Sequence, residues 1–288
     1  MSLHQTGGLP DLAAIDAAIA RATEAGALLS IRTEQAFVEE DGLRFLVRWA
    51  STLAAKDAAR KPSRPATTNP FLPPEPLLTL GPAGDAHWLV LNKFPVIARH
   101  LLIVTRDFEE QTAPISRADF DALAAVMARL GGLGFYNGGT EAGASQRHKH
   151  LQWIPESPQS DCLRGISAAL PEHGPALDVV EHPRLDWRHA FVRLGGRPDG
   201  ARLAEAFARG AAHCGLPAAA PQMPPYNLLA NDEWLLVVPR SRERFEGIPI
   251  NALGFAGSLF VRDRDAIDTV RALGPLNLLR AVATPARP

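Results

Sequence analysis

The sequence RHKHLQWI, residues 147–154, carries two histidines and a glutamine at alternate positions. Alternate side chains share one face of a β-strand, so we expect His148, His150 and Gln152 to project together. Leu151 and Trp153 then point to the opposite face, toward a hydrophobic core. The segment therefore predicts a strand that presents imidazole and amide groups on one face.

Three interpretations of the two histidines compete. They could be hydrogen-bonded structural residues of a half-buried strand, although Gln152 on the same face weakens this reading. They could bind zinc with Cys162 and His173, but the spacing fits no compact zinc motif and Gln152 is a poor ligand. In the third interpretation one neutral imidazole attacks phosphorus as a nucleophile, which divides a group transfer into two easier steps.

A loop of small residues, NGGTEAGASQ at 137–146, leads into the strand. Its backbone N–H groups can approach phosphate oxygens, and Ser145 and Gln146 add side-chain donors. The loop is not a P-loop, because no Gly-Lys-Ser/Thr follows, and it is not a dinucleotide fingerprint, because it leads into a strand. Next to the histidines it predicts an anion-binding site.

Regular elements are predicted on the N-terminal side of this motif. Helical spacing of apolar residues predicts a helix over 10–29 and another that Ser116 caps. Apolar and β-branched runs, with a turn at Asp41-Gly42, predict strands at 33–39, 43–49, 87–91, 100–105 and 133–136. The Pro-rich residues 57–76 can form neither a helix nor a central strand. This succession indicates an α+β or α/β unit around a sheet.

Beyond Pro155 the composition changes, with scattered prolines, histidines and arginines. A strand at 190–194, a helix at 201–212 and a strand pair at 226–230 and 233–238 are predicted there. A chain of 288 residues has room for about two domains. We therefore expect one domain over residues 1–160 and a smaller one over 165–288.

The composition is that of an ordinary globular protein, with 46% hydrophobic and 21% charged residues. A net charge of −1 argues against broad binding of nucleic acid or membranes, and no apolar run approaches the ~20 residues of a membrane span. No signal peptide is readable at the N-terminus, and two distant cysteines fit a reducing compartment. We expect a cytoplasmic protein without nucleic-acid or membrane partners, as a monomer or small homo-oligomer.

The motif HKHLQ after GASQ, with NKFPV at 92–96, resembles the diadenosine tetraphosphate phosphorylases, or ATP adenylyltransferases, of the histidine-triad superfamily. The likeness covers residues 45–155 well and the rest loosely. It extends to Asn69-Pro70-Phe71, Asn137, Tyr226-Asn227 and Pro239-Arg240-Ser241. The resemblance implies an α+β, histidine-triad-like fold, with an antiparallel sheet and flanking helices. It makes residues 1–160 the catalytic domain and 165–288 a C-terminal ATP adenylyltransferase domain.

The resemblance also implies roles for individual residues. His150 is the nucleophile that becomes adenylylated, His148 supports the site, and Gln152 stands where the histidine-triad hydrolases carry a third histidine. Lys61 is an alternative to Lys56 as a substrate-binding residue. The residues implied to bind substrate are Lys56, Asn92, Lys93, Asn137, Gly143, Ala144, Ser145, Gln146 and Asn227.

The implied reaction is phosphorolysis of diadenosine tetraphosphate by inorganic phosphate to ATP and ADP. Glutamine does not titrate near neutral pH, so Gln152 can hold phosphoryl oxygens without assisting water, which favours transfer over hydrolysis. We expect no protein-held metal and no organic cofactor, with a divalent cation such as Mg²⁺ on the polyphosphate. The alternatives are a hexose-1-phosphate uridylyltransferase-like enzyme and a non-catalytic nucleotide- or zinc-binding protein.

Overall fold

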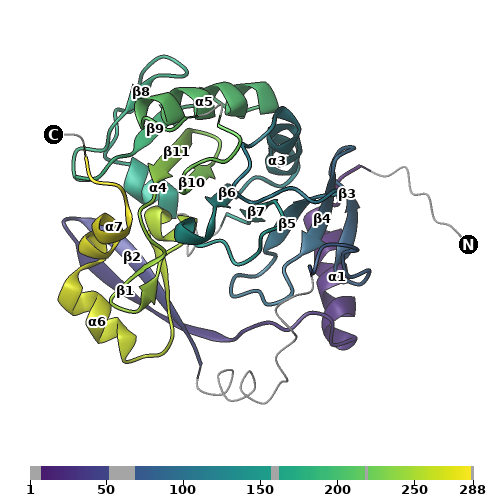
Figure 1. Cartoon of the computed structure of the whole chain (residues 1–288). Coiled ribbons are helices and arrows are strands. Elements are labelled where there is room, and N and C mark those ends of the chain that lie inside the picture. The colour runs from purple at the N-terminus through teal and green to yellow at the C-terminus, as the bar shows by residue number, and fades with distance from the viewer. Residues whose placement is uncertain (1–7, 52–68, 157–161, 218–219, 287–288) are drawn as a thin grey trace, which may run out of the picture.

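The computed structural model describes residues 8–51, 69–156, 162–217 and 220–286. Its centre is a nine-stranded sheet (Figure 1) in which every neighbouring pair is antiparallel. In spatial order the strands are β3 (Thr79–Pro82), β4 (His87–Leu91), β5 (Leu101–Thr105), β7 (His150–Ile154), β6 (Leu133–Gly138), β10 (Tyr226–Ala230), β11 (Trp234–Pro239), β9 (Ala190–Arg193) and β8 (Val179–Val180).

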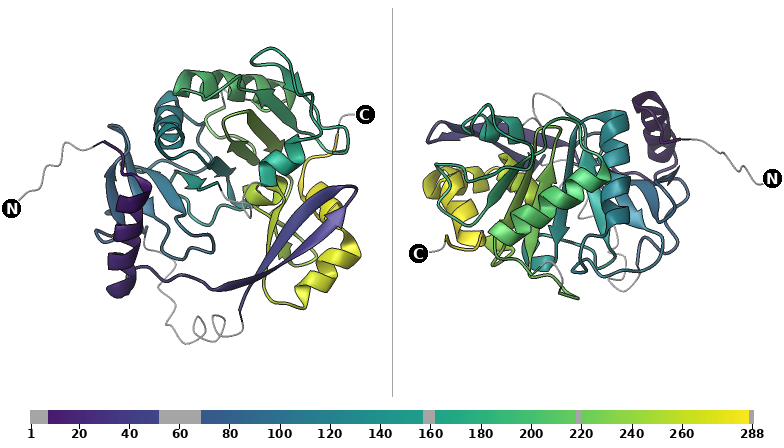
Figure 2. Two further views of the ribbon diagram at one scale, coloured as in Figure 1. Left: turned by 180° about the vertical axis from the view of Figure 1, so that it is seen from behind. Right: turned by 90° about the horizontal axis from the view of Figure 1, so that it is seen from above.

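Helices cover one face of this sheet. Helices α3 (Arg117–Leu130) and α5 (Gly200–His213) lie side by side there (Figure 2), and α1 (Leu12–Glu24) lies against the end of the sheet that holds β3 and β4. Helix α3 begins where the sequence predicts, because Ser116 and Asp119 form a reciprocal capping box. Leu151 and Trp153 are buried in the core on this face, as their alternation predicts.

A smaller sheet packs on the opposite face. The predicted hairpin at Asp41-Gly42 forms β1 (Thr33–Glu40) and β2 (Leu43–Ala50), and β14 (Ser258–Val261) pairs in parallel with β2. Side chains of this small sheet and of one face of the large sheet pack together in a second hydrophobic core, separate from the core under the helices. The remaining elements are η1 (Thr140–Ala142), α4 (Cys162–Ser167), β12 (Arg244–Phe245), β13 (Ile248–Pro249), η2 (Ala252–Ala256), α6 (Ala266–Leu273) and α7 (Pro275–Val282).

The α+β class expected from the sequence is confirmed by this mixture of antiparallel sheet and packed helices. The sheet continues across the expected division near residue 160, since β6 pairs with β10 and brings Asn137 opposite Asn227. Strands from both expected domains thus build one sheet, and the boundary itself stays a prediction. Among the described helices, none has the length and apolar character that a membrane span requires.

Candidate active site

A cavity of about 500 Å³ lies between the two sheets. Strands β4, β5, β6 and β7 form one wall, and residues 249–260 of the C-terminal region form the other. Of the residues implied to bind or transfer substrate, the structure brings together at this cavity Asn92, Lys93, Asn137, Gly143, Ser145, Gln146, His150 and Gln152. Ala144, His148 and Asn227 are not among its lining residues, and Lys56 and Lys61 lie outside the described residues.

His150 presents one nitrogen for chemistry. Its Nδ1 lies 2.8 Å from the carbonyl oxygen of His148, and because a carbonyl only accepts, Nδ1 carries the proton. Nε2 therefore holds the lone pair, and no described residue forms a hydrogen bond to it. Burial lowers the pKa of His150 to about 4, with the His148 carbonyl opposing the shift, so the ring is neutral at physiological pH. Phe71 packs against the ring at 5.5 Å between centroids.

His148 is placed differently from the sequence expectation. Strand β7 begins at His150 rather than at residue 147, and both ring nitrogens of His148 are engaged in the protein. Nε2 donates to the Thr105 carbonyl at 2.8 Å, which leaves Nδ1 to accept from the Asn69 side-chain amide at 2.9 Å. His148 thus supports the site through its carbonyl to His150 and does not line the cavity.

The orientation of Gln152 is set by a chain of hydrogen bonds. The Asn92 amide donates to His100 Nδ1 at 3.0 Å, so Nε2 of His100 carries the proton and donates to Gln152 Oε1 at 2.9 Å. Burial lowers the pKa of His100 to about 4, which keeps this ring neutral. The Gln152 NH₂ group remains as a donor, without a partner among the described residues. Asn92 was expected to contact substrate. Its side-chain NH₂ group instead donates to His100, and its Oδ1 accepts the Phe94 N–H.

The loop before β7 supplies fewer backbone donors than its composition predicts. The N–H groups of Gly143 and Ala144 bond within the loop, to Thr140 and Gly139 carbonyls, so they are not available to an anion. Gly143 has φ +92°, and a Cβ there would lie 2.8 Å from Cβ of Asn251, so glycine is required. The N–H groups of Ser145 and Gln146 have no partner in the part of the chain that the structure describes. These two residues are exposed, so their N–H groups can donate to a ligand.

Asn137 links the loop to the opposite wall of the cavity. Its Oδ1 accepts from the Asn227 amide and from the Ala252 N–H, each at 2.9 Å, and its NH₂ group has no partner among the described residues. Asn227 is fully buried behind Asn137 and also donates to the Ala142 carbonyl. The structure therefore places Asn227 as a support of Asn137, which differs from the direct substrate contact expected from the sequence.

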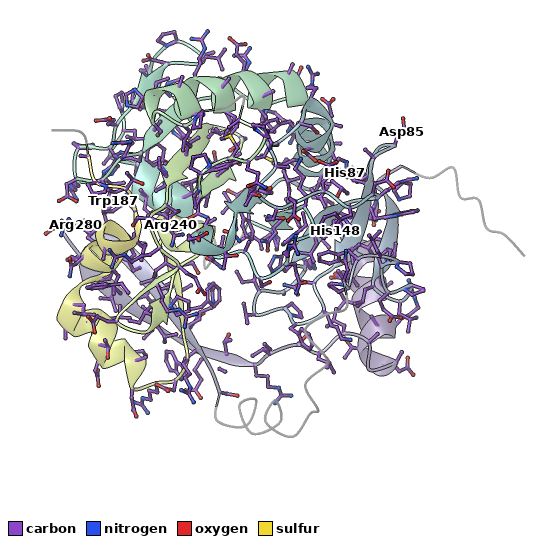
Figure 3. All side chains as sticks on the ribbon, viewed as in Figure 1. Asp85, His87, His148, Trp187, Arg240 and Arg280 are labelled. Atoms are coloured by element: carbon purple, nitrogen blue, oxygen red, sulfur yellow. The ribbon has the colours of Figure 1, made fainter. Side chains whose placement is uncertain are left out.

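Arg240 completes this support with a buried positive charge. It forms no ion pair with a carboxylate among the described residues; it donates to Asn227 Oδ1 and to the carbonyls of Ala142, Ile250 and Val282. Figure 3 shows Arg240 beside the C-terminal helices. Burial lowers its pKa to about 9, partly opposed by Glu243, so it stays charged at neutral pH. The hydrogen bonds of Arg240 thus join Ala142 of the loop, Asn227 of β10 and Ile250 of the C-terminal wall.

Of the lysines that the structure describes, Lys93 is the one at the cavity, between Asn92 and the half-exposed Phe94. Within the described ranges it forms no ion pair, so its ammonium is available to an anion. Glu75 and Glu243 are the acidic residues on the walls. No group of three or more His, Cys, Asp or Glu residues in the described part could hold a metal ion. The arrangement can bind an anion beside a neutral imidazole nucleophile.

The supporting roles of several residues were not predicted. His100 gives no local signal beyond a polar residue at the start of an apolar strand, because its partner Gln152 lies 52 residues away. Asn251 fits against Gly143 from the other wall, and it lies in a region where no element was predicted. Arg240 belongs to the Pro239-Arg240-Ser241 motif, to which the resemblance extends, but the sequence does not indicate its role.

Two family models match most of the sequence. Residues 5–166 match the family model of the Ap4A phosphorylase N-terminal domain, and residues 183–285 match that of the ATP adenylyltransferase C-terminal domain. Diadenosine 5',5'''-P1,P4-tetraphosphate phosphorylase 2 of Saccharomyces cerevisiae is 29% identical over 262 residues, which cover 79% of each chain. Protein APA1 of the same yeast is 25% identical over 73% of this chain and 74% of its own length.

Solved structures have the same fold. The crystal structure of yeast Ap4A phosphorylase Apa2 superposes with a TM-score of 0.80 at 22% identity and covers 96% of each chain. The structure of that enzyme in complex with Ap4A gives a TM-score of 0.77 and covers 97% of this chain and all of the other. The expected histidine-triad-like fold is thereby confirmed. With more than half of its residues matched by the first family model, the chain belongs to the family of the Ap4A phosphorylase N-terminal domain.

Proposed function

We propose that this protein catalyses the phosphorolysis of diadenosine tetraphosphate (Ap4A) by inorganic phosphate to ATP and ADP. The observation that carries the proposal is the neutral His150 ring, which is held through Nδ1 and leaves the lone pair of Nε2 at a cavity with anion-binding donors. Membership of the family supports it, as does the similarity to yeast diadenosine 5',5'''-P1,P4-tetraphosphate phosphorylase 2. The proposed substrates are a dinucleoside polyphosphate and a free phosphate ion.

The first step is attack of His150 Nε2 on the α-phosphorus of one adenylate. The N–P bond forms while the bond from this phosphorus to the bridging oxygen breaks, and ATP leaves with the electron pair. The adenylylated ring keeps its proton on Nδ1 and becomes an imidazolium. The His148 carbonyl, which accepts that proton's hydrogen bond at 2.8 Å, stabilises the new positive charge.

The cavity supplies donors to the phosphoryl oxygens during this transfer. The oxygen of each carboxamide in Gln152 and Asn137 is bonded within the protein, and the NH₂ groups have no hydrogen-bond partner among the described residues, so they can donate to phosphoryl oxygens. Ser145, Gln146 and the Lys93 ammonium add donors and positive charge along the polyphosphate. Phosphoryl-type transfer depends mainly on such positioning and charge stabilisation.

In the second step an oxygen of inorganic phosphate attacks the same phosphorus. The N–P bond breaks, the electron pair returns to Nε2, and ADP leaves with His150 in its starting state. Gln152 cannot take a proton from water near neutral pH, so the adenylyl-histidine persists until phosphate arrives. This distinguishes the proposed phosphorolysis from hydrolysis to ATP and AMP.

A divalent cation such as Mg²⁺ is proposed to arrive bound to the polyphosphate. Glu75 and Glu243 are the carboxylates at the cavity, and in the described residues they belong to no cluster that would hold a resident metal ion. Such a cation would neutralise charge on the substrate.

The test is the intact mass of the protein after incubation with Ap4A without phosphate. We expect a mass increase of one adenylyl group, which disappears with release of ADP when phosphate is added. His150→Ala should prevent the increase, whereas His213→Ala, a substitution at an exposed histidine on α5, should not. Formation of AMP and ATP at the same rate with and without phosphate would overturn the proposal.

The alternatives give different results in the same experiment. A uridylyl adduct formed from a UDP-hexose, without an adenylyl adduct from Ap4A, would favour uridylyl transfer. Stoichiometric zinc with no adduct from either nucleotide would favour a non-catalytic binding protein. A wild-type adduct that forms only with Ap4A supports the proposed phosphorolysis.

A further inference from the structure

The large sheet opens beside the nucleophile. Strands β6 and β7 pair from Leu133 opposite Ile154 to Phe135 opposite Gln152, and their ladder ends there. On its other side β7 stays paired with β5, where Val104 lies opposite His150. The backbone of His150 therefore loses its β6 partner at the residue that carries the reacting nitrogen.

The side chain of Gln111 fills this opening. Its Oε1 accepts the backbone N–H of His150 at 2.9 Å, and its Nε2 donates to the His150 carbonyl at 3.2 Å. The same Nε2 donates to the Asn137 carbonyl on β6 at 2.9 Å. One carboxamide thus bonds both peptide groups of His150 and bridges the two strands that have separated. It replaces the peptide group that a continuous ladder would provide.

Gln111 is itself held from several sides. Its backbone N–H donates to the Arg147 carbonyl at 2.7 Å, and the Tyr136 hydroxyl donates to its carbonyl. Glu109 accepts the Lys149 backbone N–H at 2.8 Å, so residues 109–111 run along residues 147–149. The Gln111 side chain is 3% exposed. Its position is therefore fixed before any substrate binds.

Gln111 does not line the cavity, and it cannot touch a substrate there. Its influence passes through the backbone of His150, whose ring is then fixed by the Nδ1 hydrogen bond to the His148 carbonyl. Displacement of a reacting group by about 1 Å can slow an enzymatic reaction about 10²-fold. Because Gln111 fixes both peptide groups of His150, its loss would allow the reacting nitrogen to be displaced.

We propose that Gln111 is a positioning residue for adenylyl transfer, which holds the backbone of His150 so that Nε2 points at the α-phosphorus. The proposal rests on the proposed function, because it assigns Gln111 to the nucleophile of that reaction. Gln111 is not a catalytic residue, since it touches neither substrate nor the reacting atoms. Its removal should slow formation of the adenylyl-histidine more than it weakens substrate binding.

The chain offers a matched control for loss of a buried carboxamide. Asn231 is also buried, and its Oδ1 accepts the backbone N–H groups of Glu233 and Trp234 at 2.9 and 2.8 Å in the turn between β10 and β11. It is not among the residues of the cavity. Asn231→Leu removes comparable hydrogen bonds from the fold without reaching His150.

The experiment measures single-turnover adenylylation by mass spectrometry, with Ap4A binding measured separately on the His150→Ala background. Gln111→Met keeps the length of the side chain but removes its hydrogen bonds. We expect adenylylation of the folded protein to slow about 10²-fold, with a change in the dissociation constant of about threefold or less. Asn231→Leu should lower the melting temperature and leave the adenylylation rate of the folded protein unchanged.

A second variant covers the case in which Gln111→Met does not fold. Gln111→Glu keeps the size and the acceptor for the His150 N–H, but an ionised carboxylate cannot donate to the His150 and Asn137 carbonyls. It should also slow adenylylation with little change in binding. A wild-type rate in both folded Gln111 variants, or an equal loss of rate in Asn231→Leu, would overturn the assignment of Gln111. Failure of the wild-type protein to form any adduct would instead overturn the proposed function.

Discussion

His100 donates Nε2–H to Oε1 of Gln152 over 2.9 Å, and this hydrogen bond decides which atom of the carboxamide is free. With the oxygen occupied, the NH₂ group is left for a phosphoryl oxygen. The Asn92 amide fixes the tautomer of His100 from the other side, at 3.0 Å. The donor is thus selected by His100, which bonds Gln152 directly, and by Asn92, which lies two hydrogen bonds away.

Replacement of His100 should therefore reduce the chemical step. His100→Leu leaves Gln152 free to rotate its carboxamide, so the oxygen can face the phosphoryl group and repel it. We expect kcat for Ap4A phosphorolysis to fall about 10²-fold, the magnitude for loss of one preorganised donor. Steady-state kinetics with Ap4A and phosphate measures this, and His213→Leu on the surface of α5 serves as the control. An unchanged kcat in folded His100→Leu would contradict this role of the hydrogen bond.

A histidine at position 152 should shift the reaction toward hydrolysis. Gln152→His introduces a side chain that exchanges protons near neutral pH, so it can assist attack of water on the adenylyl-histidine. We expect the adduct to decay about 10²-fold faster without phosphate, with AMP as the new product. Gln152→Met, which lacks a titrating group, should not accelerate decay. Equal lifetimes of the adduct in wild type and Gln152→His would show that Gln152 does not protect it.

The pH dependence of adenylylation follows from the low pKa of His150. Burial lowers that pKa to about 4, so the reactive neutral ring predominates at all pH values well above this. The single-turnover rate of the folded protein should therefore be level from pH 8 to about 5.5 and fall as the pH approaches 4. A rate that already halves near pH 6.5 would mean that the ring titrates as an exposed histidine does.

The same burial predicts an effect of pH on stability. His150 and His100 have ordinary pKa values of 6.5 and folded values of about 4, so the unfolded chain binds more protons between these limits. The free energy of unfolding should fall as the pH is lowered from 6.5 through 4. Urea unfolding at a series of pH values measures this slope. His150→Asn should make it shallower, and an unchanged slope would contradict the assigned burial.

Much of the fold could be predicted because its signals are local. The capping box at Ser116, the turn at Asp41-Gly42 and the alternation of residues 150–154 each depend on neighbours within a few positions. The strand expected to start at residue 147 was too long, because residues 147–149 run along 109–111 rather than in the main ladder. Nothing near residue 147 in the sequence indicates that change of partner.

The rest of the site depends on contacts between distant residues. Strand β14 joins β2 in parallel, with Ser258 opposite Leu46, and helps to form the second wall of the cavity. No element was predicted beyond residue 238, so this wall was missed. Gln111 was missed for another reason, because its carboxamide bonds peptide groups, and peptide groups leave no pattern in the sequence. The residues of β7 were found because their side chains alternate.

Lys149, between the two histidines, should be important for stability. Its ammonium is fully buried and lies 2.8 Å from both Asp119 Oδ2 and Glu109 Oε2. Burial alone would raise the pKa of Asp119, but the hydrogen bond from His87 and the charge of Lys149 lower it to about 2. Lys149→Met leaves the buried carboxylate without its cation and should lower the free energy of unfolding by about 3 kcal/mol at pH 7. Urea unfolding measures this difference.

The pH dependence of the free energy of unfolding distinguishes the Lys149–Asp119 ion pair from mere packing of the Lys149 side chain. With its pKa lowered to about 2, Asp119 contributes stability above its ordinary pKa of 3.8, and that stability is lost as the pH falls through 2. In Lys149→Met the pKa of Asp119 rises, so the loss should begin at a higher pH. Asp119→Asn removes the charge while its side-chain oxygen can still cap α3, so it should recover part of the stability lost in Lys149→Met. If the two substitutions instead add without coupling, the stability of this region does not come from the Lys149–Asp119 pair.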